Sequence, residues 1–576
     1  MKRLSSMDAN FLYIETHAAP MHYLLIGVFE GELTLAELEQ GIRANLLQLP
    51  RFTQKIVPHR FRLRHPSWQP DPLFNLCRHL FELQLTQPGT DDELLALGAK
   101  IFVGVMDRGK PLWEMHLVHG LSGNRSAVIV KMHHCMADGG AALELMKVMT
   151  TSSAMPGLNQ QKSEKRNGLA ASNGHPSPLK RIRTATVSLS HSARRELFVL
   201  GALATRRKPL PFNRTPSGER ILCRCEYSSA EARAIGAACG ATMSDVMLSV
   251  LAGGVRRYLE LHQYSTAGRN LRVMLSVNLR RNTNYEESSN LATVCPIDIP
   301  LDLNNPLECL QYVTARSKKV KDARLAEGLD AFLTVLGKTP VPVQFWSAVV
   351  LRNRSTLPYN IILTNVSSLR LPGYIFGRRV LGIYPFPTIP YSIGVSCGLL
   401  EYDEKVNLLL TMDAQAVPDG QRLRECLEQS FATLRDAAGV TKPESFSERL
   451  QQASETNRYE LLSEYVREQV ATVLHRDDEP DPQQGFFDLG MDSLSTLELA
   501  DRLQTGLGRQ LPATLIFETP NIEALTNYLA GEVLGWNDLN DQKIQASSTH
   551  VETPHQLLEK IQHLSDDEVD RLLAKT

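Results

Sequence analysis

The amino-acid sequence predicts an α/β protein in two unequal halves, followed by a small all-helical domain. The chain has 576 residues, which is too many for one hydrophobic core, so we expect at least three folding units. Up to about residue 440, apolar runs typical of strands alternate with helical patterns, as in α/β architecture. After residue 456 short amphipathic helices replace the strand-like runs.

Strands are expected where β-branched and aromatic residues cluster, and helices where apolar residues recur every three or four positions. The clearest strand signals are MHYLLIGVFEG at 21–31, SAVIVKMHH at 126–134, LRVMLSVNL at 271–279 and YNIILTNVSS at 359–368. The clearest helical patterns lie at 35–49 and 243–262. Because the polar stretch 151–180 has no apolar periodicity, we interpret it as a crossover between the halves.

The third piece is predicted to be a four-helix bundle, with helical patterns at 458–474, 493–508 and 521–535. Residues 457–535 contain fourteen acidic residues against five arginines and no lysine, whereas the preceding part is basic. We therefore expect the two parts to dock or to share a partner. The predicted domains are 1–180 and 181–440 for the two α/β halves, 441–456 for a linker, 457–535 for the bundle, and 536–576 for a linker with an acidic helical tail.

Hydropathy, cysteine spacing and composition predict where the protein is located and which classes of protein it does not belong to. The first thirty residues lack the apolar core of a signal peptide, and no stretch reaches the ~18 apolar residues of a spanning helix, so a cytoplasmic protein is predicted. The nine cysteines are scattered without metal-ligand spacing, which favours buried thiols over disulfides or a metal site. The composition excludes a collagen, a coiled coil or a wholly disordered chain. No nucleic-acid partner is expected.

The stretch KMHHCMADGG, residues 131–140, is the first candidate site. It lies between a predicted strand and a predicted helix, where rigid neighbours can aim a side chain into a cavity. A histidine there can take a proton near neutral pH, so His133 and His134 are candidate bases and Asp138 a candidate carboxylate that orients one of them. Two alternatives are ordinary packed histidines and a metal site, for which only two histidines and one aspartate are visible.

The H-H-x-x-x-D-G pattern resembles the motif shared by chloramphenicol acetyltransferase, peptide condensation domains and the bacterial wax ester synthase/diacylglycerol acyltransferases. Seven further stretches are similar to the last of these families in the family's own order, among them APMHYLLIGVFEG at 19–31 and LSVNLRRNTNYEESSNLATVCPIDIPL at 275–301. The other five are LSSMDANFLYIE at 4–15, RGKPLWEMHLVHGL at 108–121, GATMSDVMLSVLAGGVRRYL at 240–259, ILTNVSSLRLPGY at 362–374 and MDAQAVPDGQRL at 412–423. The resemblance implies two chloramphenicol-acetyltransferase-like subdomains with a tunnel between them. It also implies that His134 is the general base and that His133 and Asp138 shape the loop, with Arg280 or Arg281 as a candidate partner of Asp138.

Two segments depart from that family's pattern. Its usual Asn-Asp pair is Ser244-Asp245 in this chain, and its Asn-Val-Pro-Gly-Pro loop is NVSSLRLPG, from Asn365 to Gly373. Both segments are expected to frame the tunnel, so substrate choice is where we expect this chain to differ. The helical pattern at 194–207, RRELFVLGALATRR, is a candidate tunnel-lining or membrane-facing helix, with a basic-ended core helix as the alternative.

The second candidate site is Ser493, in GFFDLGMDSLSTLELADRL at 485–503. A serine before an amphipathic run is often only a helix cap. The whole stretch resembles acyl and peptidyl carrier domains, however, and this implies a 4′-phosphopantetheine arm on Ser493, attached by a phosphopantetheinyl transferase. The amphipathic segment 555–576 resembles tails that follow carrier domains in polyketide assembly lines, and a solvated helix is the alternative.

Together the two resemblances imply an ester-forming acyltransferase. An acyl chain held on its own carrier domain, or on acyl-coenzyme A, would pass to an alcohol in polyketide or lipid biosynthesis. An acyl-loading enzyme or an assembly-line protein would be a partner, and peripheral membrane contact is expected. Three alternatives stay open: an amide-forming condensation enzyme, a carrier that holds the acceptor while coenzyme A brings the donor, and a non-catalytic carrier and docking protein.

Overall fold

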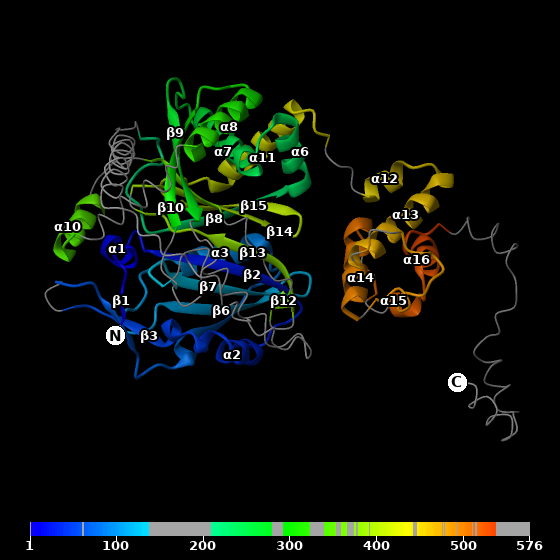
Figure 1. Ribbon diagram of the computed structural model, residues 1–576, viewed down its shortest axis with the longest axis horizontal. Helices are drawn as coiled ribbons and strands as arrows, with labels where there is room; N and C mark the ends of the chain where they lie inside the picture. The colour runs from blue at the N-terminus through cyan, green and yellow to red at the C-terminus, as the bar shows by residue number, and fades with distance from the viewer. Residues whose placement is uncertain are drawn as a thin grey trace, which may run out of the picture. The chain divides into compact units, whose positions relative to one another are not determined.

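The computed structural model divides the chain into two compact units, Met1–Thr441 and Lys442–Thr576, which are described separately here as the large and the small unit (Figure 1). The structure describes residues 2–59, 63–136, 209–278, 292–322, 339–352, 359–365, 374–375, 378–390, 392–441, 446–474, 476, 479–491, 493–509, 511–512 and 515–536. The large unit has the expected mixed α/β architecture, and the small unit has the expected helical one.

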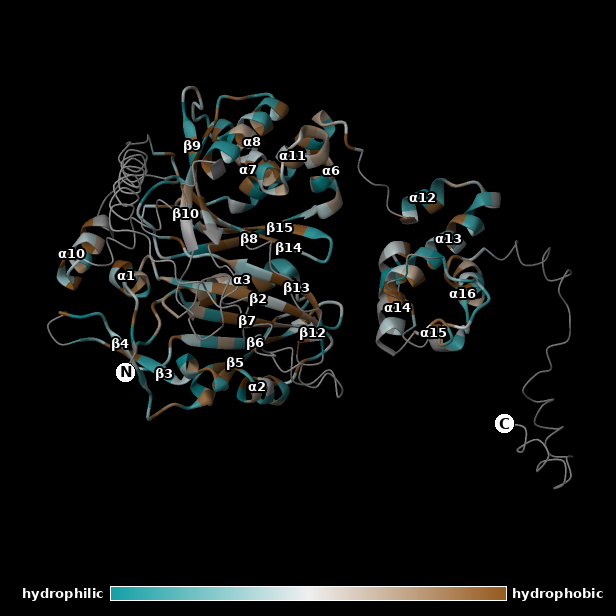
Figure 2. Cartoon of the chain, in the orientation of Figure 1, coloured by the Kyte–Doolittle hydropathy of each residue, from teal (hydrophilic) through white to brown (hydrophobic). Residues whose placement is uncertain are grey.

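The first sheet of the large unit has six strands in the order β12-β13-β2-β7-β6-β5. Their bounds are Tyr374–Ile375, Arg378–Phe386, His22–Glu30, Arg125–His133, Trp113–Leu121 and Leu80–Gln84, in that order. Every residue of β2 except Glu30 is buried, because the strand has apolar cover on both faces. Figure 2 shows this hydrophobic centre along β2 and β7.

Alternate side chains of β2 enter two different cores. Tyr23, Leu25 and Phe29 pack with α1 (Ser6–Ile14) and α2 (Leu35–Ala44) on one face. Leu24, Ile26 and Val28 pack on the other face with α3 (Asp91–Phe102) and with two leucines of the second sheet, Leu222 and Leu409. The second core therefore joins the two sheets, and it explains why the run from 22 to 29 is apolar without alternation.

The second sheet also has six strands, in the order β10-β9-β11-β14-β15-β8. Their bounds are Ala292–Pro300, Asn270–Asn278, Ile361–Asn365, Val395–Tyr402, Lys405–Asp413 and Arg220–Ser228. Its outer layer consists of α6, α7, α8 and α11, at Ser229–Cys239, Met243–Leu261, Pro306–Asp322 and Gly420–Ala437 (Figure 1). A short third sheet, β1-β4-β3, combines Lys2–Arg3, Ser67–Pro70 and Gln54–Val57.

The helix layer is packed closely enough to require a glycine. A Cβ atom on Gly254 of α7 would lie 2.5 Å from Cδ2 of Leu427 on α11, so the two helices approach more closely there than any other residue would allow. Within the described segments, no single helix is both long and apolar enough to cross a bilayer. The helices α6 and α7 reach that length and apolar content only when they are taken together, and the chain bends by 98° between them.

One strand crosses the expected boundary between the halves. β13 belongs by sequence to the region 181–440, yet it pairs antiparallel with β2 of the first sheet, from Phe386 opposite Leu24 to Val380 opposite Phe29. Division of the chain at 180/181 therefore does not separate two self-contained halves. The physical reason is that β2 is apolar on both faces and would expose its backbone groups as an edge strand without β13.

Within the described segments the small unit has five α-helices and the π-helix η6 (Leu529–Val533), and its core includes residues of all of them. Their bounds are Phe446–Gln452 for α12, Glu455–Val473 for α13, Ser493–Leu507 for α14, Leu515–Glu518 for α15 and Ile522–Tyr528 for α16.

The expected linker 441–456 needs correction, because it contains α12. Phe446 and Leu450 of this helix are buried in the core of the small unit. The Phe446 ring stacks on that of Tyr465, with 3.8 Å between centroids. The segment was predicted to be a linker because most of its residues are polar. Its two apolar residues at helical spacing, Phe446 and Leu450, are nevertheless enough to pack a short helix against the core.

We predict that Phe446→Ala destabilises the small unit by about 3 kcal/mol, because it removes the buried ring that anchors α12. Native-state hydrogen exchange of the α13 and α14 amides in the full chain measures this. Phe487→Ala is the matched control, since Phe487 is 62% exposed and its removal should cost less than about 0.5 kcal/mol. Equal protection in Phe446→Ala and the parent would mean that α12 is only an ordered part of a linker.

Candidate active site

A pocket lies between the two sheets of the large unit, at the end of β7. It has about 380 Å³ of empty space and is partly open to solvent. Its walls come from β2, β11, β13, β14 and the turn after β7: Tyr23, Leu24, His134, Thr364, Pro385, Phe386, Pro387 and Gly398. A Cβ atom on Gly398 would lie 2.5 Å from the carbonyl oxygen of Pro385. The glycine therefore allows β14 and β13 to meet at this pocket.

His134 is the predicted site residue that reaches this pocket. Its ring stacks on Phe11 of α1, with 4.1 Å between centroids and 12° between planes. The edge of Tyr23 contacts it from β2 at 5.7 Å and 83°. The backbone N–H of His134 donates to the carbonyl oxygen of Met21 at 2.8 Å. Two aromatic neighbours and one backbone bond thus hold the imidazole in a fixed plane at the pocket wall.

His133 points away from the pocket and is 1% exposed. Its Nδ1 accepts a hydrogen bond from the backbone N–H of Cys135 at 3.1 Å. Its Nε2 lies 3.1 Å from Oε1 of Glu15. Because Nδ1 is an acceptor, the ring proton is on Nε2, which donates to the carboxylate. This geometry suits the loop-shaping role expected for His133 and leaves no ring nitrogen for a metal.

Glu15 is a site residue that the sequence reasoning missed. Its Oε1 also accepts from the backbone N–H of Met21 at 3.0 Å, and its Oε2 accepts from Arg108 at 2.7 Å. Burial would raise the pKa of Glu15, but these bonds and that from His133 outweigh it and lower the pKa from 4.5 to about 2. The carboxylate is therefore ionised at neutral pH. The sequence did contain one indication of this contact: Glu15 is the last residue of the family-like segment 4–15, and Arg108 is the first residue of the family-like segment 108–121.

A second buried ion pair supports the same loop from the second sheet. Nη1 of Arg220, on β8, lies 3.1 Å from Oδ2 of Asp413, on β15, and the two side chains are 1% and 0% exposed. Arg220 also donates to the carbonyl oxygen of Ala18 at 2.7 Å. Asp413 accepts two further bonds from the backbone and hydroxyl of Ser217. The loop from Glu15 to Met21 is thus fixed at one end to the histidine turn and in its middle to the other sheet.

The two segments that depart from the family pattern meet beside the pocket. Asn365, at the end of β11, donates through Nδ2 to Oγ of Ser244 on α7 at 2.8 Å. Its neighbour Thr364 lines the pocket. Asp245 instead caps α7, where its carboxylate accepts from the Thr242 hydroxyl at 2.6 Å. The expectation that these segments adjoin the pocket agrees with this geometry for Ser244 and Asn365; residues 366–373 lie outside the described part of the chain.

Ser493 is the first residue of α14 in the small unit. The preceding loop contains Gly490, which adopts φ +92°, and it is anchored by the buried side chains of Phe486 and Met491. A phosphodiester on Ser493 would lie at the start of a 15-residue helix, where free N–H groups and the helix dipole favour an anion. The residues present therefore fit a phosphopantetheine group.

Several predicted positions lie outside the described residues: Asp138, Arg280, Arg281, the segment 194–207 and the tail 555–576. Within the described part of the chain, no three His, Cys, Asp or Glu side chains are grouped in a way that could hold a metal ion.

His134 directly follows an inner strand and faces a pocket between two sheets, which is the arrangement that the resemblance to acyltransferases and condensation domains of this double α/β fold implies. Family models match three parts of the chain: the wax ester synthase/diacylglycerol acyltransferase catalytic domain at residues 4–247, the WS/DGAT C-terminal domain at 289–435, and the phosphopantetheine attachment site at 464–529. The chain belongs to the wax ester synthase/diacylglycerol acyltransferase family and carries a phosphopantetheine attachment domain in addition.

Individual relatives agree with this assignment. Two Mycobacterium tuberculosis (strain H37Rv) proteins named as probable diacylglycerol O-acyltransferases are each 27% identical: tgs1 over 450 residues, covering 75% of this chain and 96% of tgs1, and tgs2 over 469 residues, covering 75% and 98%. The solved structure of the wax ester synthase/diacylglycerol acyltransferase from Marinobacter aquaeolei VT8 has a TM-score of 0.56 at 21% identity, covering 76% of this chain and 100% of that one.

The first condensation domain of the calcium-dependent antibiotic synthetase has the same fold. Its TM-score is 0.52 at 14% identity, and the match covers 76% of this chain and 96% of that one. The expected family, fold class and acyltransferase type are thereby confirmed. The roles of individual residues stay predictions.

We predict that Glu15 makes stability pH-dependent. Because folding lowers its pKa from 4.5 to about 2, its contribution is complete above pH 4.5 and is lost as the pH falls towards 2. The unfolding free energy of the parent should exceed that of Glu15→Gln by about 3 kcal/mol more at pH 6 than at pH 2. Urea unfolding of both proteins across this range measures it. A difference that stays constant with pH would show that the carboxylate is not stabilised by its partners.

We further predict that Arg220→Met destabilises the large unit by about 3–5 kcal/mol, because the Asp413 carboxylate would stay buried without its guanidinium partner. Arg422→Met is the matched control: Arg422 is 59% exposed in its pair with Glu425, and its loss should cost less than about 1 kcal/mol. Chemical denaturation of the parent and of both variants measures their free energies of unfolding. If both variants lose a similar free energy of unfolding, the buried Arg220–Asp413 pair stabilises the large unit no more than an exposed ion pair does.

Proposed function

We propose that this protein is an ester-forming acyltransferase that passes an acyl chain from a pantetheine thioester on Ser493 to an alcohol, with His134 as the general base. The observation that carries the proposal is the fixed His134 imidazole at a pocket between the two sheets, in a chain that also contains a phosphopantetheine attachment domain. The names of the relatives support an alcohol acceptor, since those proteins are named O-acyltransferases.

The chemistry assigned to the chain is proton transfer and positioning. When attached to Ser493, the arm supplies a thioester that holds the acyl group. His134 takes the hydroxyl proton as the alcohol oxygen bonds to the thioester carbonyl carbon, and it returns that proton to the sulfur when the carbon–sulfur bond breaks. Nε2 is the ring nitrogen that can do so because Nδ1 is buried. Phe11 and Tyr23 keep the ring in one plane, so the base is held in place before the alcohol arrives. The apolar residues Leu24 and Phe386 in the pocket wall suit an acyl chain.

A carrier domain in the same chain suits a thioester donor. Tethering raises the effective concentration of a bound group to about the millimolar range for a short linker. A phosphopantetheinyl transferase is then required as a partner, and an acyl-loading enzyme supplies the chain. Acyl-coenzyme A is the alternative donor, with the same base and pocket.

We predict that His134→Ala keeps the acyl chain on Ser493 when an alcohol is added, whereas the parent discharges it. Losing a positioned base should slow transfer by about 10²–10⁴-fold. The measurement is intact-protein mass spectrometry after pantetheinylation and acyl loading, with Ser493→Ala as the variant that should gain neither mass.

The matched control is His119→Ala. His119 lies on β6 near the start of β7, at the opposite end of the sheet from His134, so discharge should proceed at the parent rate. If His134→Ala discharges as fast as the parent, transfer happens elsewhere and the large unit is a recruiting domain. If acyl-coenzyme A supports ester formation equally in Ser493→Ala, the carrier is not the donor site.

A further inference from the structure

A second pocket lies in the outer helix layer of the large unit, which Figure 1 shows over the second sheet. Its lining residues come from α7, α8 and α11 and from the chain that leads from β10 to α8, and it has about 450 Å³ of empty space, partly open to solvent. None of these residues lines the pocket at His134. Two of them are arginines, Arg256 and Arg257 on α7, and none is acidic. The pocket is therefore a separate cavity with a cationic lining, and the proposed reaction does not use it.

The guanidinium of Arg256 has one edge without a partner among the described residues. Its Nη1 donates to both carboxylate oxygens of Glu260, at 3.1 and 3.3 Å, and to Oδ1 of Asn304 at 3.2 Å. Its Nε is buried without a hydrogen-bond partner, and no described residue accepts from its Nη2. Nε and Nη2 form the edge with which arginine binds an oxyanion through two parallel bonds. Because a buried N–H without an acceptor is destabilising, we expect an acceptor to enter the pocket.

Other arginines of the large unit use this edge on a carboxylate of the protein itself. Nε and Nη2 of Arg43 both donate to Glu39, one helical turn away on α2. The same two nitrogens of Arg272 donate to Asp298, at 2.7 and 3.0 Å. Arg256 also has a glutamate one turn away, but that glutamate is bound to Nη1. The edge that these other arginines use internally is thus left for a ligand in the pocket that Arg256 lines.

Further hydrogen-bond donors line the pocket from two helices. Arg257 donates through Nη2 to the hydroxyl of Thr433 on α11 at 2.8 Å, and it forms no ion pair with a described carboxylate. The hydroxyl of Ser430, also on α11, lines the pocket. A Cβ atom on Gly253 would lie 2.3 Å from that hydroxyl oxygen, so glycine keeps the space beside it open. The Arg256 edge alone would satisfy the two oxygens of a carboxylate, whereas donors on two helices match the larger number of oxygens of a phosphate group.

We propose that this pocket binds a phosphate group. Nε and Nη2 of Arg256 donate to two of its oxygens, and Arg257 and the Ser430 hydroxyl donate to the others. Leu303 and Leu434 also line the pocket, and they suit the carbon part of a small phosphate monoester. A bound phosphate would join α7 to α11 across the gap that Gly253 leaves. The proposal does not depend on the acyl transfer proposed above, because the two pockets share no residue.

The test is titration of inorganic phosphate with the full chain at constant ionic strength, measured by the broadening of the phosphorus-31 NMR line of phosphate. Arg256→Gln should weaken binding at least about tenfold, because it removes the charged edge that holds two phosphate oxygens. Ser430→Ala removes one donor and leaves the ion pair of Arg256 with Glu260 in place, so it should weaken binding several-fold. This second variant keeps the proposal testable if Arg256→Gln does not fold.

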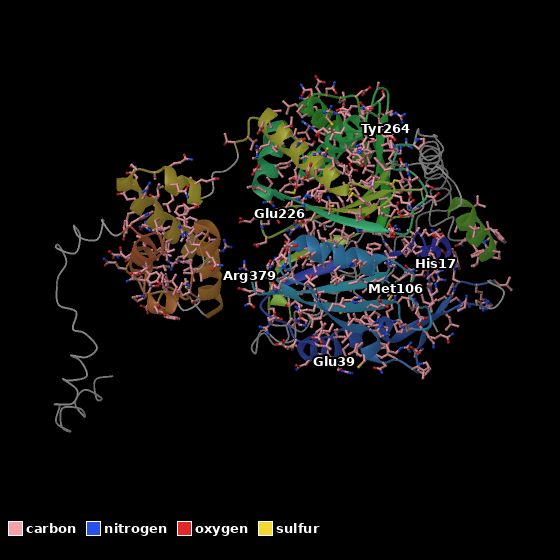
Figure 3. The ribbon with its side chains drawn as sticks, turned by 180° about the vertical axis from the view of Figure 1, so that it is seen from behind. His17, Glu39, Met106, Glu226, Tyr264 and Arg379 are labelled. Carbon is pink, nitrogen blue, oxygen red and sulfur yellow. The ribbon has the colours of Figure 1, made fainter. Side chains whose placement is uncertain are left out.

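Arg43→Gln is the matched control. Arg43 is also paired with a glutamate one turn away, but it is 56% exposed, and its partner Glu39 lies on the opposite side of the large unit from Tyr264, which follows α7 (Figure 3). Phosphate binding by this variant should stay at the parent level.

Two competing ligands identify what the pocket takes. Glycerol 3-phosphate that binds more tightly than inorganic phosphate would assign the site to a phosphate monoester, and weaker binding would assign it to free phosphate. Displacement of phosphate by acetate at equal concentration would overturn the assignment of phosphate. Equal binding by Arg256→Gln and the parent would overturn the proposal as a whole, as would a parent that does not broaden the phosphate line.

Discussion

The buried carboxylate of Glu15 is the constraint on which the candidate site depends. A charge that is removed from water must be fully hydrogen-bonded, and here the donors come from three separate parts of the chain. His133 ends the inner strand β7, Arg108 lies before β6, and Met21 lies before β2. Satisfying one carboxylate therefore brings three segments together. The position of His134 follows from this, because its backbone bonds to the same Met21 and its neighbour in sequence bonds to Glu15.

The two adjacent histidines have different surroundings, and in the proposed reaction only His134 acts as a base. His133 is the last residue of β7 and His134 is the first residue of the turn that follows, and of the two only His134 lines the pocket. His133 is buried with both nitrogens engaged, whereas His134 is half-buried and lines the pocket. In the proposed reaction His133 therefore positions the turn, and His134 is the residue that can meet the substrate.

Much of this could be predicted from the sequence, and the remainder could not for physical reasons. The strands at 21–31 and 126–134 and the helix at 243–262 were evident because their periodicity is local. The pairing of β13 with β2 is a contact between residues more than 350 positions apart, and no local pattern records it. Glu15 looked like an ordinary helix-end glutamate, because the partners that bury it are distant in sequence. The helix α12 was hidden in a polar segment, since two apolar residues are too few for a periodic signal.

The departures at Ser244 and Asn365 show how the pocket can change while its frame is kept. Asp245 retains the capping bonds that start α7, so the helix still begins at the same place. The residue before it, Ser244, accepts a hydrogen bond through its hydroxyl from the amide of Asn365. This bond joins α7 to β11. Since Thr364 beside Asn365 lines the pocket, a change of side chain at this bridge lies next to the space where the substrate binds in the proposed reaction. A change of substrate at this position requires no change in the base, in the loop that holds it or in the fold.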